Sequence, residues 1–546
     1  MDRILAHRKA ILFATAVFAL SLVAAFMYLS NVPDRDMVSR YIPMAEAFAC
    51  RDFAFAFHPR IPPLQPVCGG IIAKCFGVDA FLGLKIASAC WHFLGGVLIW
   101  ILFTTLYPED RKVALFGTVL YCFFPYIFHM SYSGLRESAK CTLLILLALA
   151  MVRVSRERPR WWDYLLLGLA AGLGSLTRAE LTAVGLFCIF CAAIFEGGPK
   201  GVPFRSALAT LVALLICTGN SMINYHFFGH AMLDVRFARM FLKHAGRAAN
   251  PVDALLLAAL ITVLLPAAAY AAKRIFRRVP VGYFWGAALL FTVAMTVYTI
   301  VNIKNPIEQG TVGEFVLSLL EGLYYFIVPI AFIHIGQQLF LHKLSRAEHA
   351  LLIVAVSQFL LCILQIQIFH HKLDVSSRYL YSTPPLFLGF FLLGWEDFYR
   401  WFSLILPKWC VKLMLAASIG GLAFMYVYHV PQPIYREYHD RSQLADKAAI
   451  GEICALIADD DLPQHPHRTE LSPWEYRSRR LPKIWFHGHP KISVAAYFVG
   501  GSITRSLSEA DYIVSEHLPK RIKRKNASLL GLVRGRKSVL GVWRIR

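Results

Sequence analysis

The chain has 546 residues, of which 57% are hydrophobic, and a formal net charge of +22 at pH 7. Its apolar residues are gathered into runs too long for soluble cores, which argues against several soluble domains and for an α-helical polytopic membrane protein. The basic residues lie largely in short loops and in the tail. We therefore expect membrane lipids and lipid phosphate, and no nucleic acid, as partners of the positive charge.

Apolar runs of membrane-spanning length begin near the N-terminus and recur along the chain. The first, residues 10–30, is longer than a signal-peptide core and has no convincing small-residue cleavage site, so we expect a retained helix with a cytoplasmic N-terminus. Residues 83–107 and 411–428 are similar runs with almost no charge. Together the runs predict about thirteen transmembrane helices.

Lysine and arginine collect in alternate loops, and this alternation sets the predicted orientation. Basic loops resist translocation and stay in the cytoplasm. The predicted cytoplasmic segments are residues 3–9, 111–112, 153–160, 273–278 and 342–346. Thirteen crossings from an internal start place the protein in the inner (cytoplasmic) membrane, with its C-terminal tail on the periplasmic side.

The first outer loop, residues 31–78, is too long for a simple connector. Residues 41–49 have helical apolar spacing, and residues 62–76 are apolar and led by proline. We expect two interfacial helices here, lying where a lipid head group and a second substrate could meet.

From Pro431 onward the hydropathy falls, and short apolar stretches such as residues 484–486 and 512–514 alternate with polar helical ones. This pattern predicts a transmembrane domain of residues 1–430, followed by a small extracytoplasmic α/β domain of residues 431–546. The basic run at residues 520–525 is compatible with translocation, because long translocated domains escape the charge rule.

Several short motifs fall at or near the predicted outer ends of the helices. They are Pro33-Asp34-Arg35-Asp36, Tyr41, Ala45-Glu46, His58-Pro59-Arg60-Ile61-Pro62-Pro63-Leu64, Ser133-Gly134-Leu135-Arg136-Glu137, residues 168–178 and Ser377-Arg378-Tyr379-Leu380. In this order and placement the chain resembles the GT-C membrane glycosyltransferases, specifically the bacterial branch similar to protein mannosyltransferases and the lipid A aminoarabinose transferase. The resemblance covers residues 1–430 and adds little for the tail.

The resemblance implies an enzyme that moves a hexosyl or pentosyl group from a polyprenyl-phosphate-linked donor to a lipid, glycan or protein acceptor, usually with inversion. Such a displacement needs a base for the nucleophile and a cationic clamp for the departing phosphate. By resemblance Asp36 is the candidate base, and Asp34 is its close rival because the spacing to Tyr41 departs from the family pattern. Glu137 stands where relatives often carry a second acid. A solvated loop or helix cap is the alternative for the aspartates, and an ion pair or cap near Arg136 is the alternative for Glu137.

Arg378 is the first candidate for the phosphate, because a guanidinium group matches phosphate in a two-pronged geometry. The other candidate substrate-binding residues are Tyr379, Tyr41, His58, Arg60, Lys85, Arg136 and Arg178. Arg178 and Glu180 flank a predicted turn between helices, so a purely structural ion pair is an equal alternative for them.

The chain shows no glycine-rich phosphate loop or nucleotide fingerprint, which fits a lipid-carried donor and indicates no cofactor. A divalent metal is left open, with His370, His371 and Asp374 as candidate ligands. Cys50 and Cys68 share the first outer loop and could form a disulfide, although spacing alone cannot show it.

Two other functional classes have to be weighed against a transferase. A flippase or transporter for lipid-linked glycans would be favoured by an inverted repeat, and we see no convincing one. An oligosaccharide polymerase would be indicated by a large outer loop in the second half of the chain, whereas here the large loop comes first.

Overall fold

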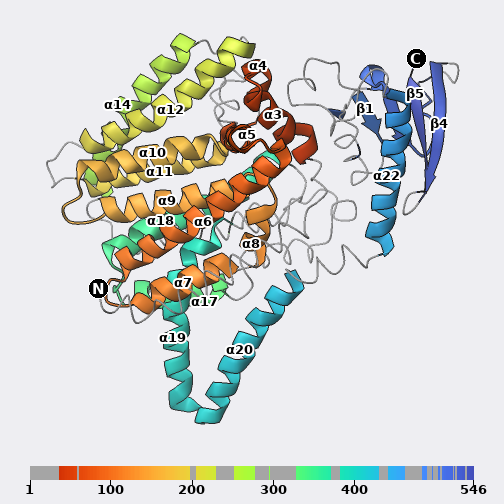
Figure 1. Cartoon of the computed structure of the whole chain (residues 1–546). Coiled ribbons are helices and arrows are strands. Elements are labelled where there is room, and N and C mark those ends of the chain that lie inside the picture. The colour runs from red at the N-terminus through yellow and green to blue at the C-terminus, as the bar shows by residue number, and fades with distance from the viewer. Residues whose placement is uncertain are drawn as a thin grey trace.

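The structure is a computed structural model of the whole chain, shown in Figure 1. It describes residues 36–57, 61–123, 125–196, 204–228, 251–276, 290, 294, 327–370, 382–429, 441–461, 483–487, 495, 502–503, 507–520, 522, 526–534 and 538–545. The predicted first span at residues 10–30 lies outside these ranges.

Helices form the body of the molecule. The short helices of the first outer loop are η1 (Met37–Tyr41), α3 (Ile42–Ala49), α4 (Phe53–Ala56) and α5 (Leu64–Phe76). The body continues with α6 (Ala80–Leu106), α7 (Arg111–Phe123), α8 (Pro125–Tyr132), α9 (Glu137–Val154), α10 (Trp161–Ser175), α11 (Ala179–Phe195), α12 (Phe204–Phe228), α14 (Pro251–Phe276), α17 (Ile327–Phe340), α18 (Arg346–His370), η3 (Pro384–Phe387), α19 (Leu388–Ile405) and α20 (Lys408–His429). Figure 1 shows α19 and α20 leaving the body as a V.

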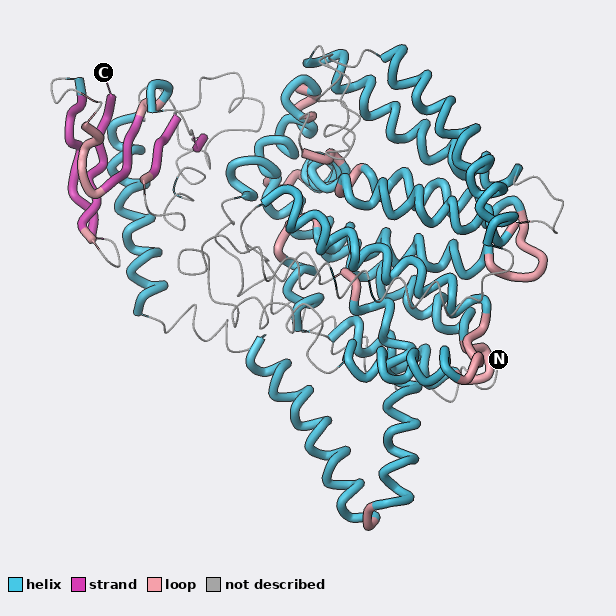
Figure 2. The backbone as a smooth tube through the Cα atoms, turned by 180° about the vertical axis from the view of Figure 1, so that it is seen from behind, coloured by secondary structure: helices cyan, strands magenta, loops and turns pink. Residues whose placement is uncertain are grey.

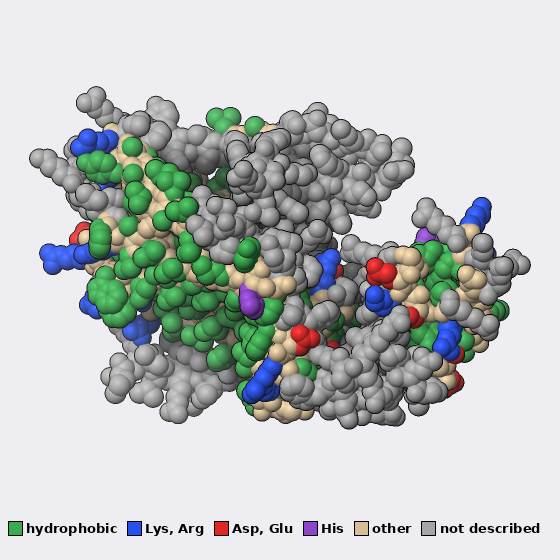
Figure 3. Space-filling view, turned by 90° about the horizontal axis from the view of Figure 1, so that it is seen from above, with side chains coloured by type: hydrophobic (Ala, Val, Ile, Leu, Met, Phe, Trp, Pro, Cys, Tyr) green, Lys and Arg blue, Asp and Glu red, His purple; other side chains and the backbone are tan. Residues whose placement is uncertain are grey.

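Two helices among the described residues are long and apolar enough to cross a bilayer, namely Ala80–Leu106 and Phe204–Phe227. Figure 3 shows that hydrophobic side chains cover much of the visible face of the helical body, while charged side chains gather at its edges and on the separate C-terminal unit. A continuous apolar surface of this kind is what lipid tails require.

The helices α9 to α12 run back and forth and define two opposite ends of the body. The end at which α9 and α11 finish is basic: Arg346 donates to the carbonyl of Phe195 (2.6 Å), and Lys273 donates to the carbonyl of Glu196 (2.8 Å). The Glu196 carboxylate in turn caps α12 by accepting from the backbone N–H of Arg205 at 2.8 Å. At the other end α9 and α11 begin, one helix length or about 27 Å away.

Small residues allow these helices to approach closely. A Cβ atom added at Gly168 of α10 would lie 2.5 Å from the carbonyl oxygen of Ala209 on α12, and one at Gly172 would lie 2.6 Å from Ile216. In a bilayer the hydrophobic effect does not drive helices together, so their association depends on close packing of this kind. The main apolar core lies between these helices and α6, α9 and α18.

The C-terminal part forms a small unit of mixed sheet and helix, so the expected sheet-containing domain is present. Its strands are β1 (Lys483–Phe486), β2 (Ser502–Ile503), β3 (Tyr512–Ser515), β4 (Ala527–Arg534) and β5 (Val539–Ile545), in the order β2-β1-β3-β5-β4, with the short helix η6 (Leu507–Glu509) before β3. β1 pairs parallel with β2 and β3, and β5 pairs antiparallel with β3 and β4. The helix α22 (Arg441–Asp461) covers the sheet, and its Ile453 and Ile457 are fully buried there.

Candidate functional site

Asp36 lies at the start of a wide helical turn. It is the N-cap of η1, a π-helical turn that continues into α3, and it pairs with Arg40 at 3.5 Å. In a π-turn the backbone hydrogen bonds join residues five apart, so Asp36 and Tyr41 lie about one turn from each other. The unusual spacing between this acid and Tyr41 is thereby accommodated, since the extra residue is taken up by the wider turn.

A tight turn before α9 carries the second group of charged side chains. Gly134 has φ +75°, and Ser133 Oγ accepts from the backbone N–H of Leu135 at 3.3 Å. Gln65 on α5 forms hydrogen bonds to this turn and to α6. Its Nε2 donates to the Gly134 carbonyl (3.0 Å) and to Ser88 Oγ (3.0 Å). The side-chain amide of Gln65, on an outer-loop helix, therefore fixes the position of the segment that begins α9.

We expect Gly134→Ala to lower sugar transfer several-fold, because an added Cβ would lie 2.7 Å from Met37 Cε, next to Asp36, in a site with little room. Gly77→Ala is the matched control, since Gly77 also has a left-handed φ, +65°, but no atom within 4 Å of an added Cβ. Both variants should lose about 1–2 kcal/mol of folding free energy from backbone strain. Equal activities in the two purified variants would contradict this account of the turn.

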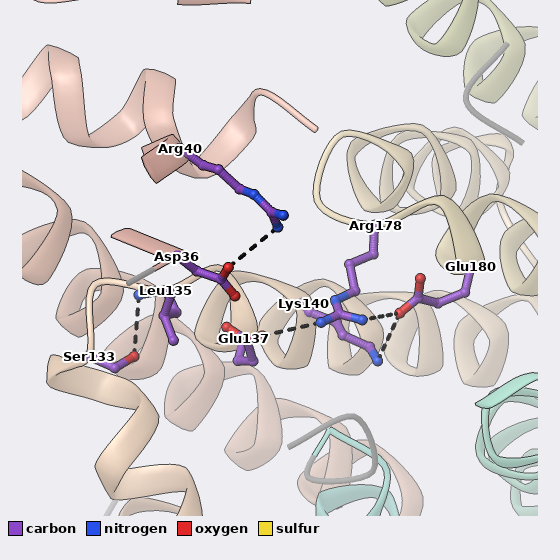
Figure 4. A network of polar contacts seen from close by, with 8 residues as sticks. All are labelled: Asp36, Arg40, Ser133, Leu135, Glu137, Lys140, Arg178 and Glu180. Atoms are coloured by element: carbon purple, nitrogen blue, oxygen red, sulfur yellow. Dashed lines mark hydrogen bonds and ion pairs between the residues drawn. The ribbon is translucent and has the colours of Figure 1, made fainter. Parts of the chain in front are cut away.

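A buried network of ion pairs joins the starts of α9 and α11 (Figure 4). Arg178 donates to Glu137 Oε1 (3.2 Å) and to Glu180 Oε1 (3.0 Å), and Lys140 Nζ lies 3.2 Å from the same Glu180 oxygen. The four side chains are between 1% and 6% exposed. Ionised side chains that are buried this deeply are stable only when each is paired with an opposite charge.

The hydroxyl of Tyr41 lies within reach of both groups. Burial raises the pKa of Tyr41 above its usual value, and nearby charges modify the effect: Arg136 and Arg178 lower the pKa, whereas Glu137 and Asp36 raise it. Tyr41 therefore stays neutral at physiological pH and can donate or accept a hydrogen bond. Residues separated by some 140 positions thus surround one tyrosine.

Arg136 differs from the other basic residues of this region. Among the described residues no carboxylate forms an ion pair with it, and its buried Nε has no hydrogen-bond partner. Four charged groups act on Tyr41, namely Arg136, Glu137, Arg178 and Asp36, and the last three of these form ion pairs with described residues. Arg136 is the member of this set without an ion-pair partner among the described residues, so an added anion could pair with its guanidinium group.

Comparison with known proteins finds one matching family model and several similar solved structures. Residues 60–223 match the family model described as dolichyl-phosphate-mannose-protein mannosyltransferase. No curated protein matches the chain. Among solved structures, the archaeal oligosaccharyltransferase AglB from Archaeoglobus fulgidus, in complex with an inhibitory peptide and a dolichol-phosphate, is similar with a TM-score of 0.54 and 11% identity, over 93% of this chain and 70% of that chain. The Archaeoglobus fulgidus oligosaccharyltransferase in its apo form gives a TM-score of 0.55 and 11% identity, over 92% and 69%.

Residues 60–223 therefore resemble the protein mannosyltransferases in sequence, and the chain shares its fold with the archaeal oligosaccharyltransferase. At this level of identity the likeness to the archaeal enzyme concerns the fold, and the family match rests on the segment from α5 to α12. The resemblance predicted from the order of the motifs is confirmed.

Of the candidate residues predicted from the sequence, the structure brings Asp36, Tyr41, Arg136, Glu137 and Arg178 together. Lys85 is also buried, on α6, with its ammonium group 5.6 Å from the centre of the Phe81 ring. The other candidates, Asp34, His58, Arg60, Arg378 and Tyr379, lie outside the described residues, as do His371 and Asp374 of the possible metal site.

Four further features of the structure bear on the sequence-based expectations. Glu137 pairs with Arg178, and not with its neighbour Arg136. Lys140, which motif reasoning missed, completes the network; its signal was a lysine three residues after Glu137 in an otherwise apolar helix. Cys50 and Cys68 are free thiols. Within the described ranges no cluster of three His, Cys, Asp or Glu side chains could hold a metal.

Proposed function

We propose that the protein transfers a hexosyl or pentosyl group from a polyprenyl-phosphate-linked donor to a lipid, glycan or protein acceptor at the outer face of the membrane, with inversion. The observation that carries this proposal is the partly buried Arg136 guanidinium, which lacks a carboxylate among the described residues and lies beside acidic side chains. A donor phosphate would supply the missing negative charge through charge-assisted hydrogen bonds. The dolichol-phosphate bound by the similar archaeal enzyme supports a donor of this chemistry.

The two described acids would have different tasks. The Asp36 side chain is 32% exposed and can meet an incoming acceptor, whereas the Glu137 side chain is 6% exposed and bound to Arg178. In the proposed step Asp36 takes the proton of the acceptor hydroxyl or amine as its oxygen or nitrogen bonds to the anomeric carbon. The bond from that carbon to the phosphate oxygen breaks, and Arg136 stabilises the departing lipid phosphate.

We infer that the site lies on the periplasmic side of the inner membrane, with the N-terminus in the cytoplasm. Support comes from the helix α9, which begins at the charged network and ends beside the predicted cytoplasmic segment of residues 153–160. Arg205 donates to the carbonyl of Pro159 at that basic end. On this proposal residues 1–430 form the transferase domain, and residues 431–546 form an extracytoplasmic domain above its outer surface.

Binding of undecaprenyl phosphate tests the role of Arg136. We expect Arg136→Gln to weaken binding in nanodiscs by roughly 10- to 100-fold, because a hydrogen bond to a charged group contributes about 1.5–3 kcal/mol. Uncharged undecaprenol should bind wild type and variant alike, and Arg51→Gln, an exposed outer-loop change, should leave both affinities unaltered. Intrinsic tryptophan fluorescence can report the dissociation constants.

Transfer itself is measured with radiolabelled polyprenyl-phosphate mannose and polyprenyl-phosphate arabinose, each incubated with purified protein and cell-envelope membranes. We expect label from one of these donors to leave the donor fraction. The proposal fails if neither donor loses label and undecaprenyl phosphate binds no better than undecaprenol.

A further inference from the structure

The turn that carries Asp36 is held from two sides. Met37 and Tyr41 are buried in a small apolar cluster with residues of the helical body, such as Leu84 and Leu135. Val38, between them in sequence, is 4% exposed but belongs to a different cluster. The other members of that cluster are Ala449, Ile450, Ile453, Ile457, Ile484, Ala495, Tyr512, Val514, Val533, Leu540 and Val542.

All of those partners belong to the C-terminal unit. Its edge strand β2 lies against η1, and β1 joins β2 to the rest of the sheet through the pairs Lys483 with Ser502 and Ile484 with Ile503. Figure 2 shows the short strand segment nearest to the helical body, with the longer strands farther away. Among the described residues, η1 is therefore a point at which the C-terminal unit contacts the helical body.

This contact matters because η1 is a short turn, supported on its C-terminal side by its continuation into α3. A π-turn is rare and is found mostly as a single turn at functional sites. The turn has only five residues, and the pairing of Arg40 with Asp36 is partly exposed, so it adds little rigidity. Apolar contacts on both sides of the turn, together with its continuation into α3, hold the backbone that carries Asp36.

We propose that the C-terminal domain positions Asp36, with Val38 as the positioning residue that links the domain to the acid-bearing turn. The inference rests on the proposed function, in which Asp36 is the base. Val38 touches no substrate; it acts through the turn. A small displacement of a catalytic group lowers the rate of the chemical step while leaving donor binding at Arg136 intact, since a misplacement of about 1 Å can cost roughly 100-fold in rate.

The test compares Val38→Asp and the milder Val38→Thr with Val38→Ile, which keeps an apolar contact, and with Leu532→Asp, an exposed position on the far edge strand β4. We expect kcat for donor consumption to fall roughly 100-fold in Val38→Asp and several-fold in Val38→Thr. The dissociation constant for undecaprenyl phosphate should stay unchanged. Val38→Ile should keep most of the wild-type kcat, and Leu532→Asp should keep all of it.

Amide hydrogen exchange gives a second readout that needs no turnover. Exchange over η1 and β2 should become faster in Val38→Asp and Val38→Thr, and stay as in wild type in Leu532→Asp. Unchanged exchange over η1 in both Val38 variants would overturn the inference, as would a normal kcat in Val38→Asp. If wild type itself neither binds undecaprenyl phosphate nor consumes donor, the proposed function fails, whereas the exchange result still decides whether the domain holds the turn.

Discussion

Asp36→Asn is expected to reduce sugar transfer by about 10²- to 10⁴-fold, the range in which a positioned general base contributes. Asparagine keeps the size of the side chain and its place at the start of η1, but it cannot take the acceptor proton. The change also removes the negative partner of Arg40, whose 3.5 Å contact is partly exposed and contributes little to stability. The measurement is the initial rate of label release from the donor.

Asp52→Asn is the control for Asp36→Asn. It makes the same chemical change in the same outer loop, at an exposed residue outside the charged group around Tyr41. We expect it to retain the wild-type rate. Near-normal transfer by Asp36→Asn, with unchanged affinity for undecaprenyl phosphate, would remove Asp36 as the base and return attention to Asp34.

Arg178→Met should cost about 3–5 kcal/mol of stability, because it removes the buried ion pairs of Arg178 with Glu137 and with Glu180. The expected observation is a marked fall in the melting temperature of the purified protein in detergent. Arg400→Met is the control: its pair with Glu396 is exposed, so the melting temperature should hardly change.

A combined variant separates the cost of unpaired charge from the loss of packing. When Arg178→Met, Glu137→Gln, Glu180→Gln and Lys140→Met are made together, no uncompensated charge is left among the four. We expect this variant to recover much of the stability that Arg178→Met loses, since neutral replacements of buried ion networks are often tolerated. Equal melting temperatures for the single and the combined variants would show that shape, and not charge, holds α9 against α11.

The parts of the site that sequence reasoning found share a simple property. Asp36, Glu137 and Arg178 are charges beside apolar runs, where an ionised group is costly unless it has a task or a partner. Counting the predicted membrane spans from the N-terminus predicts that all three lie at the same end of the helices. Lys140 was missed because the apolar sequence around it indicates only that it is buried. The sequence does not show that its partner is Glu180 on another helix.

The long apolar runs, the alternation of basic loops and the order of the outer-loop motifs determined by themselves that this is a helical membrane protein resembling GT-C transferases, because hydropathy and charge are properties of the local sequence. Partner choice was decided only by the tertiary structure. Arg136 and Glu137 are adjacent in the chain, but neighbours around a helix start do not face each other, so Glu137 pairs with Arg178, and no carboxylate among the described residues pairs with Arg136. The contact of Val38 with a domain some 400 residues away likewise depends on packing across the whole fold.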